Sequence, residues 1–362
     1  MDIAIISCAN TRCGIGRYSA ELSSIYDSLN HNVTLYRKEI GEEDYVVRYH
    51  HRSLKFLRHY IAPYYLMKAY DANNFDVIHA DYVDAASTYP SGTKTPLVST
   101  VHDAIPFIYP ASGFAQYWYK RQLRLTAEKA YKLIVVSNKS KQDLIKFTDI
   151  KPDQIAAIHN GINHDFFYPD EKKAGNDVFT IRYIGGLGGP YKNVNLLLET
   201  AEQLEKKEID YRMEIGGGFP EHTELPELAE SLNLKNVSFT GFIPDEELRS
   251  FLAGADLFLY PSLYEGFGFP PLEAMACGTA AVAAKRGSLP EVLEGGAILA
   301  EPTAEEFCEQ VLRIKNNTDL QKELEEKAVA VSGKYTWDRC ASETLALYEE
   351  ALNKKSAKPV VE

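Results

Sequence analysis

The sequence has few cysteines and no long apolar stretch. Five of its 362 residues are cysteine, an odd number without CxxC spacing, which argues against a disulfide framework or a zinc site. No uncharged apolar run approaches the ~20 residues that a bilayer-spanning helix needs. The apolar run Ile3–Ile6 is too short for a leader and is typical of a buried first strand. We therefore expect a chain without a cleaved leader that is located in the cytoplasm.

Net positive charge is also lacking. The formal net charge is −12, and it is unevenly distributed. Residues 1–170 hold 19 Lys and Arg against 18 Asp and Glu, whereas residues 171–362 hold 20 against 33. Because an acidic chain is a poor general binder of nucleic acid, no nucleic-acid partner is expected. The composition is that of a soluble globular enzyme, and the length favours two domains.

Short apolar runs alternate with helical segments throughout the chain. In the first half, strands are predicted at Ile3–Cys8, Val33–Tyr36, Val77–His79, Leu97–His102, Leu133–Val136 and Ile155–Ile158. After a Gly-, Asn- and Pro-containing stretch, strands are predicted at Phe179–Ile184, Met213–Gly216, Val237–Thr240, Leu257–Tyr260 and Ala280–Ala283. This alternation predicts an α/β fold of two doubly wound, Rossmann-like domains, residues 1–168 and 169–337, facing a central cleft.

Residues 260–284 form the most informative stretch. Glu265 and Glu273 lie eight positions apart, with Gly266-Phe267-Gly268-Phe269 between them. Pro271 suits the first turn of a helix, which would also contain Glu273. Backbone N–H groups of such a loop and helix attract anions, and a carboxylate can accept hydrogen bonds from a ribose diol. From spacing alone, the alternative is a Glu273 that compensates the helix dipole and a solvated Glu265.

The chain as a whole resembles the retaining GT-B glycosyltransferases of family four. Residues 260–284 contribute most to this resemblance. Further segments in matching order are Gly14–Tyr18, Val101–Pro106, Val136–Ser140, Asn160–Ile162, Lys192–Asn193, Gly216–Gly218, Thr240–Pro244, Gly287–Glu291 and Tyr335–Trp337. The resemblance implies the GT-B architecture, with an acceptor-binding first domain and a C-terminal helix, about 338–354, that packs back on it.

The resemblance also implies a nucleotide-sugar donor held by the second domain. Glu273 would bind the ribose hydroxyls, and Glu265 the hydroxyls of the donor sugar. His102 would lie against the donor sugar, and Lys192 would neutralise the leaving diphosphate. The catalytic residues so implied are His102, Glu265 and Lys192. The other implied donor-binding residues are Gly14, Gly16, Arg17, Gly186, Gly266, Phe267 and Gly268.

One position departs from the family pattern. Gly186 stands where many relatives carry an arginine shortly before the lysine. The charge of the diphosphate must then be met by Lys192, by Arg17 or by loop amides.

Structural roles without a part in catalysis remain alternative interpretations of the same residues. Lys192 could be a surface lysine, and His102 a structural histidine at a strand end. Gly14–Gly16 could be a tight turn or part of a dinucleotide fingerprint. The fingerprint needs an acidic residue near the end of the second strand, where Glu39 follows two basic residues, so this alternative is disfavoured.

The sequence also lacks an Asp-x-Asp triplet, the usual carboxylate pair for a metal-bound diphosphate. We therefore expect neither a metal nor another cofactor, with cationic side chains stabilising the leaving group. The predicted function is retaining transfer of a hexose from GDP-mannose or a UDP-hexose to a glycan or lipid-linked acceptor, as in polysaccharide synthesis. The alternatives are a non-catalytic nucleotide-sugar-binding protein and a GT-B sugar-nucleotide epimerase.

Basic and aromatic residues are interleaved in two stretches of the first domain, 45–70 and 117–124. Such mixtures suit an anionic membrane surface or a phosphate-bearing acceptor. The candidate acceptor or membrane residues are Arg52, Lys55, Arg58, Trp118, Lys120 and Arg121. The membrane interpretation implies peripheral contact with the inner face of the membrane. The alternative is an ordinary amphipathic helix with a solvated basic face.

Overall fold

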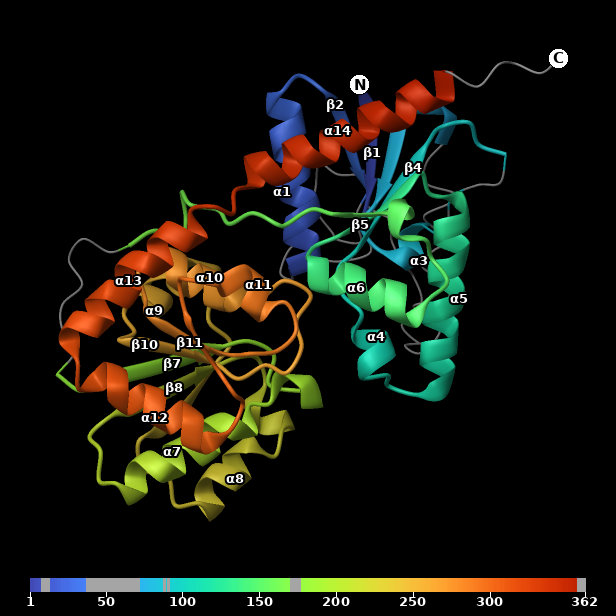
Figure 1. The fold of residues 1–362 in the computed structure, drawn as a ribbon. Helices are drawn as coiled ribbons and strands as arrows, with labels where there is room; N and C mark the ends of the chain where they lie inside the picture. The colour runs from blue at the N-terminus through green and yellow to red at the C-terminus, as the bar shows by residue number, and fades with distance from the viewer. Residues whose placement is uncertain (8–13, 37–71, 87–88, 90–91, 170–176, 357–362) are drawn as a thin grey trace. The chain divides into compact units, whose positions relative to one another are not determined.

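The structure is a computed structural model that describes residues 1–7, 14–36, 72–86, 89, 92–169 and 177–356 (Figure 1). It divides into two compact units. The first comprises Met1–Gly161 with Trp337–Glu362, and the second comprises Ile162–Thr336. The division follows Gly161, whereas the sequence suggested residue 168, because Ile162 N and His164 Nε2 both hydrogen-bond the carbonyl of Tyr335 in the second unit.

A six-stranded parallel sheet forms the core of the first unit. Its strand order is β2-β1-β3-β4-β5-β6, and the apolar runs of β3 and β4 are buried along their whole length. The strands are β1 (Asp2–Ile6), β2 (Asn32–Tyr36), β3 (Val77–Ala80), β4 (Leu97–Val101), β5 (Lys132–Val135) and β6 (Ile155–Ala157). In register, Ile3 faces Val33 on one side and Val77 on the other.

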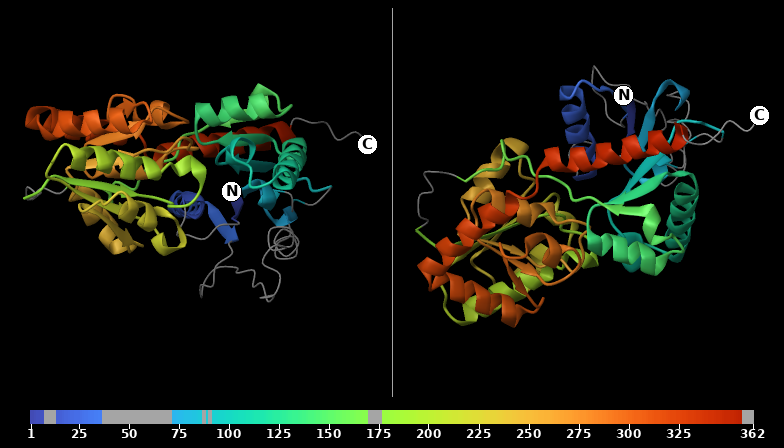
Figure 2. Two further views of the ribbon diagram at one scale, coloured as in Figure 1. Left: turned by 90° about the horizontal axis from the view of Figure 1, so that it is seen from below. Right: turned by 45° about the horizontal axis from the view of Figure 1, so that its top comes forward.

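Helices flank this sheet, and the last of them comes from the far end of the chain. The helical elements are α1 (Gly14–Ser28), η2 (Ala72–Asn74), α3 (Val83–Ala86), α4 (Ile105–Ile108), α5 (Gly113–Lys129), α6 (Asn138–Phe147), η3 (Pro152–Gln154) and α14 (Trp337–Ser356). Ser112 and Ser137 cap α5 and α6 by accepting a main-chain N–H. Helix α14 lies beside α1, where the Tyr26 hydroxyl donates to the Ala341 carbonyl (Figure 2).

The second unit repeats the architecture. Its sheet has the order β12-β11-β10-β7-β8-β9, again with parallel pairing. The strands are β7 (Thr180–Ile184), β8 (Arg212–Gly216), β9 (Val237–Gly241), β10 (Leu257–Tyr260), β11 (Ala281–Ala284) and β12 (Ile298–Ala300). The helices are η4 (Pro190–Lys192), α7 (Asn195–Lys206), η5 (Pro220–His222), α8 (Leu225–Ser231), α9 (Asp245–Ala253), α10 (Phe269–Ala276), α11 (Leu289–Leu293), α12 (Ala304–Lys315) and α13 (Thr318–Ser332).

The prediction of two doubly wound α/β halves is confirmed. The sequence missed β12, a three-residue strand that pairs with β11 at Val282↔Ile298 and is too short to show alternation. Along the described part of the chain, no helix combines the length and apolar character needed to cross a membrane.

Candidate functional site

The second unit has a topological switch point between β7 and β10. Strand β7 pairs with β8 on one side and with β10 on the other, and the chain completes β8 and β9 before it crosses to β10. In open parallel sheets, ligands bind outside the carboxyl ends of the strands at such a point. The two loops that leave these ends are residues 185–194 and 261–268. Six of the predicted donor-binding residues lie in them: Gly186, Lys192, Glu265, Gly266, Phe267 and Gly268.

Hydrogen bonds join these two loops. The Tyr191 carbonyl accepts from Leu263 N at 2.7 Å, and Ser262 Oγ lies 3.1 Å from the same oxygen. Asn193, which adopts a left-handed φ of 53°, donates from Nδ2 to the Pro261 carbonyl at 3.3 Å. The loops are therefore fixed to one another within the unit.

One carboxylate oxygen of Glu265 accepts three hydrogen bonds. Lys192 Nζ, Tyr260 Oη and Ser262 Oγ each lie 2.7 Å from Oε1. Glu265 is buried, and burial of a carboxylate is costly unless such hydrogen-bond partners compensate it. Within the described residues, all hydrogen bonds to this carboxylate are made through Oε1, which leaves Oε2 for a ligand hydroxyl. Lys192 and Glu265, to which the family resemblance gave separate donor-binding roles, form an ion pair; those roles stay predictions.

Two buried tyrosines support this carboxylate. Burial and the charge of Glu265 raise the pKa of Tyr260 and of Tyr183 well above the usual value. Both hydroxyls therefore remain donors, and the rings stack with centroids 5.8 Å apart. Tyr260 donates to Glu265, while Tyr183 donates to the Gly186 carbonyl at 3.0 Å. The pair orients the carboxylate and the loop after β7 together.

Gly186 has room for a side chain. Its φ lies outside the left-handed region, and a Cβ there would meet only Lys192 Cε, at 3.8 Å. The absence of the arginine expected from the family pattern is therefore not imposed by the backbone. It leaves Lys192 as the cation that the structure places beside Glu265 in this loop.

Helix α10 begins earlier than predicted. Gly268, with a left-handed φ of 103°, is its N-cap, and Phe269 is its first residue. The prediction that Glu273 lies in the first turn is therefore wrong, because Phe269 and both prolines precede it in the helix. Glu273 is buried, and its charge contributes, after burial and the charge of Glu265, to the raised pKa of Tyr260. Its role toward a ribose stays a prediction.

The loop between the two glutamates is held by Ser288. Its Oγ lies 3.0 Å from the carbonyl oxygen of Glu265 and 2.9 Å from that of Phe267, and its single proton is shared between these two acceptors. Phe267 itself is buried and packs edge-on against Phe269. The donor contacts expected from the main-chain N–H groups of Gly266, Phe267 and Gly268 remain predictions.

His102 is buried at the carboxyl end of β4 in the first unit. It hydrogen-bonds the main chain of Asp81, and Nε2 has no partner among the described residues. Since a carbonyl only accepts, the proton is on Nδ1, and Nε2 presents a buried lone pair. Burial lowers the pKa of His102 to about 4, so the ring is neutral near pH 7. This arrangement suits a hydrogen-bond acceptor for a ligand hydroxyl.

Aromatic and polar contacts connect His102 to α14. Its ring packs edge-on against Tyr18 at 5.1 Å, and the Tyr18 hydroxyl lies 3.0 Å from Thr100 Oγ1. Thr100 Oγ1 lies 2.7 Å from His79 Nε2, and His79 Nδ1 contacts the Tyr348 hydroxyl of α14. Burial, together with the nearby His102, lowers the pKa of His79 to about 3. Side chains from both ends of the chain therefore fix the surroundings of His102.

The three predicted N-terminal donor residues lie at the start of α1. The helix begins at Gly14, so Gly14 and Gly16 are helical rather than in a preceding turn, and Gly16 is buried. Arg17 is half-buried in the same first turn. A helix N-terminus attracts anions, which is compatible with the predicted approach to a diphosphate. That role stays a prediction.

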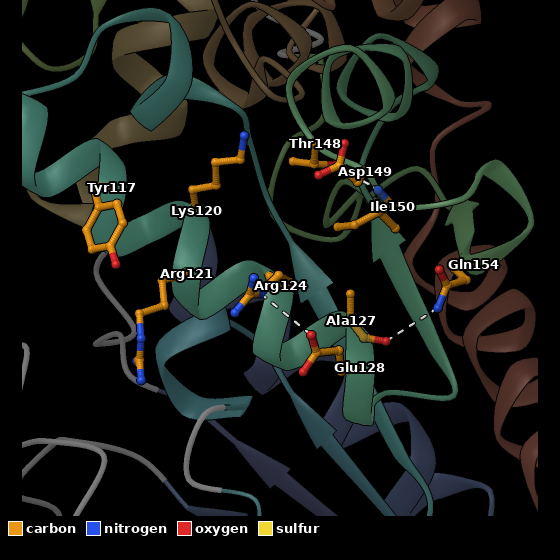
Figure 3. Close-up of a pocket in the computed structure, with 10 residues that line it drawn as sticks. All are labelled: Tyr117, Lys120, Arg121, Arg124, Ala127, Glu128, Thr148, Asp149, Ile150 and Gln154. Atoms are coloured by element: carbon orange, nitrogen blue, oxygen red, sulfur yellow. Dashed lines mark hydrogen bonds and ion pairs between the residues drawn. The ribbon is translucent and has the colours of Figure 1, made fainter.

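The candidate surface residues separate into two sets. Arg52, Lys55 and Arg58 lie outside the described residues. Trp118, Lys120 and Arg121 belong to α5 and lie on or beside its exposed face. Figure 3 shows the pocket on this side of the unit, lined by α5 and by residues of the segment 148–154.

Sequence reasoning missed several residues that build the site. Tyr260, Ser262 and Ser288 hold Glu265 and its loop, and Asp81 accepts from Ser19 Oγ at 2.5 Å. An acidic residue two positions after the predicted strand Val77–His79 is the signal that marks Asp81. Ser288 lies in the segment Gly287–Glu291 that resembles the family, but its contact with the loop after β10 exists only in the folded chain.

Metal-ligand chemistry is not evident in the described ranges. No group of three or more His, Cys, Asp or Glu side chains is placed there to hold a metal ion. Independence from metals stays a prediction.

Two family models match consecutive parts of the chain. The model described as Glycosyltransferase Family 4 matches residues 13–166, and the model described as Glycosyl transferases group 1 matches residues 168–330. The chain is 27% identical over 305 residues to the MMP alpha-(1→4)-mannosyltransferase of Mycolicibacterium hassiacum, covering 78% of this chain and 72% of that protein. It is 30% identical over 264 residues to the serotype-specific mannosyltransferase WbdA of Escherichia coli, covering 67% of this chain but 32% of WbdA.

Solved structures share the fold at low sequence identity. Sucrose-phosphate synthase from Thermosynechococcus elongatus matches with a TM-score of 0.82 at 21% identity, over 98% of this chain and 99% of that chain. HepE from Anabaena, in complex with UDP and glucose, matches with a TM-score of 0.77 at 19% identity, over 97% of this chain and 100% of that chain.

Proposed function

We propose that this chain, which belongs to the group 1 glycosyltransferases of family 4, transfers a hexose from a nucleotide-diphosphate sugar to a glycan or lipid-linked acceptor. The mannosyltransferase relatives support GDP-mannose as donor, and the UDP bound to HepE supports a UDP-hexose as the second candidate. Synthesis of a polysaccharide or glycoconjugate in the cytoplasm is the role we infer.

The ion pair between Lys192 and Glu265 at the switch point is the observation that carries this proposal. It places a cation and an oriented carboxylate side by side where a doubly wound sheet receives its ligand. Lys192 has three N–H donors, so it can keep Glu265 and also bind a phosphate oxygen. Glu265 Oε2 would then accept from a sugar hydroxyl, and Glu273 from the ribose.

Retention of the anomeric configuration without a metal is part of the proposal. The acceptor hydroxyl attacks the anomeric carbon from the face that the diphosphate leaves. The bond to the diphosphate breaks as the new C–O bond forms, and the acceptor proton passes to a phosphate oxygen. Lys192, Arg17 and helix N-termini would stabilise the departing charge. Support comes from the sequence, which lacks an Asp-x-Asp triplet.

His102 would position the donor sugar by accepting a hydrogen bond from a sugar hydroxyl at Nε2. A neutral ring with its proton on Nδ1 is an acceptor and not a general acid. The unpartnered, buried state of Nε2 supports this role, because such an atom costs stability unless something binds it.

The alternative functions predict different behaviour. A non-catalytic nucleotide-sugar-binding protein would bind the same donor without turnover. A GT-B epimerase would release a changed nucleotide sugar without an acceptor. The ion pair at the switch point is compatible with each, whereas family membership favours transfer.

Thermal unfolding with nucleotide sugars tests the donor site. We expect one of the GDP-, UDP-, ADP- or dTDP-sugar series to raise the Tm without metal, since ligand at about 100 times its Kd stabilises by about 2.7 kcal/mol. Glu273→Ala should abolish the shift, because it removes the ribose acceptor. Glu294→Ala, an exposed glutamate after α11, is the matched control and should keep it. No shift with any series at millimolar ligand would refute the proposed donor site.

Restoring an arginine at Gly186 should strengthen donor binding. The Gly186→Arg variant has space for the side chain, so its stability should change by no more than ~0.5 kcal/mol. A charge-assisted hydrogen bond to the diphosphate, about 1.5 kcal/mol, should lower KM for the donor roughly tenfold. Gly188→Arg adds the same charge at a second exposed, unobstructed position and should leave KM unchanged. Equal KM values for both variants and the wild type would contradict a diphosphate beside Gly186.

A further inference from the structure

Helix α5 has an exposed face of mixed aromatic and basic character. Positions 114, 117, 121, 124 and 128 follow one another at helical spacing and are all exposed, whereas Tyr119, Leu123 and Ala127 are buried on the opposite face. Along the exposed face, aromatic residues occupy the N-terminal half and basic residues the middle. The helix is therefore amphipathic around its axis, and its exposed face changes from aromatic to basic along its length.

The aromatic half is unusually exposed. The side chains of Phe114 and Tyr117 are 62% and 65% exposed. Phe114 stacks on Trp118 with ring centroids 6.5 Å apart, and the Arg121 guanidinium lies over the Trp118 ring at 5.5 Å. Large aromatic rings next to cations are characteristic of surfaces at the boundary between lipid headgroups and acyl chains.

A pocket of about 420 Å³ adjoins the basic half. Lys120, Arg121 and Arg124 contribute to its lining, together with the carboxylates Glu128 and Asp149. In Figure 3, Lys120 extends on the side of Thr148, whereas Arg121 extends away from it. Arg124 pairs with Glu128 at 3.6 Å, but both side chains are exposed, so a phosphate can displace this weak pair. The pocket thus offers cations to an anion of headgroup size.

We propose that this face of α5 docks the protein onto an anionic phospholipid membrane, with a headgroup phosphate in the pocket beside Lys120 and Arg124 and with Phe114 and Tyr117 at the interface. Charge complementarity supports a local contact. The second half of the chain carries most of the negative charge, so an anionic surface would repel it and attract the basic face of α5. Docking of this kind does not depend on the chemistry of the donor site.

Flotation of the full chain with lipid vesicles tests the proposal. We expect binding to vesicles that contain about one-third phosphatidylglycerol, little binding to pure phosphatidylcholine, and weaker binding at high salt. Each basic residue at an anionic surface contributes about fivefold, so Lys120→Glu/Arg121→Glu/Arg124→Glu should lower the partition coefficient at least a hundredfold. Phe114→Ala/Tyr117→Ala should lower it about tenfold, and this loss should persist at high salt.

Matched variants in the second unit provide the controls. Arg313→Glu/Lys322→Glu/Lys327→Glu makes the same change in net charge at exposed helical positions. Phe219→Ala/Phe242→Ala removes two aromatic rings of the same exposure, 67% and 64%. Both control variants should bind vesicles within about twofold of the wild type, because in this proposal vesicle binding depends on the exposed face of α5. Circular dichroism would show that every variant is folded.

Two results would overturn the proposal. One is equal vesicle binding by wild type and the α5 variants. The other is absence of vesicle binding together with a Tm increase by inorganic phosphate that the triple α5 variant loses, which would identify a site for a soluble phosphate-bearing acceptor. Vesicle binding is measured without a nucleotide sugar. Failure of docking is therefore distinguishable from failure of the donor site, which the thermal-shift experiment measures.

Discussion

Replacing Lys192 with methionine should lower kcat about a hundredfold to a thousandfold. Lys192 is the cation that the structure places against Glu265 at the switch point of the second sheet, with Nζ 2.7 Å from Oε1. In the proposed reaction it meets the charge that develops on the leaving diphosphate, and removal of one such donor costs about 3–4 kcal/mol of transition-state stabilisation. Steady-state kinetics with the donor identified by thermal shift would measure the loss.

Loss of an ion pair also destabilises the fold, so the comparison needs a variant that suffers the same loss elsewhere. Arg182 and Glu214 form such a pair in the same sheet, 2.6 Å apart and with side chains 15% and 18% exposed, against 17% and 12% for Lys192 and Glu265. Arg182→Met and Lys192→Met should therefore lower the Tm by similar amounts. Only Lys192→Met should lower kcat.

The kinetic pattern distinguishes the possible roles of Lys192. A cation that acts on the leaving group lowers kcat and kcat/KM together, because its contact strengthens in the transition state. A cation that only binds the ground-state diphosphate raises KM and leaves kcat unchanged. A kcat for Lys192→Met equal to that of Arg182→Met would remove Lys192 from the chemical step.

Much of the fold was predictable because most of the parallel strands are short, buried apolar runs between polar segments. Strand β10 is buried on every residue and has the predicted limits, Leu257–Tyr260, whereas β4, which is also buried throughout, ends one residue before the predicted His102. Strand β12 failed this criterion, since three residues cannot establish a pattern. The start of α10 at Phe269 was missed because Pro271, a typical first-turn residue, suggested a later beginning.

The charged residues of the candidate site could be picked out from the sequence, whereas the residues that hold them in place could not. Glu265 and Lys192 are 73 positions apart, and the family pattern brought both to attention before the structure showed their contact. Ser262 and Tyr260 gave no signal, because a serine or tyrosine near a strand end is common. Their role depends on the distance to one carboxylate oxygen, which only the folded chain determines.

Acidification from about pH 7.5 to about pH 5 should destabilise the first unit through two buried histidines. Burial lowers the pKa of His102 to about 4 and of His79 to about 3, from an ordinary value of 6.5. Above pH 6.5 the folded and unfolded states are both neutral at these positions. Below it the unfolded chain binds protons that the folded chain does not, so the free energy of unfolding decreases as the pH falls. The loss should be about 2 kcal/mol for each histidine at pH 5, measured by urea unfolding.

Replacing one of the two histidines with a residue that does not titrate should remove about half of this decrease in the free energy of unfolding. His79→Gln retains an amide that can hydrogen-bond Thr100 and Tyr348, but it does not titrate, so its stability should depend less on pH. His222→Gln, at an exposed histidine of the second unit, should behave as the wild type. A wild-type stability that is the same at both pH values would mean that the two histidines bind protons in the folded chain. His102 Nε2 would then carry a proton instead of a lone pair, and its proposed role as acceptor for a donor hydroxyl would be lost.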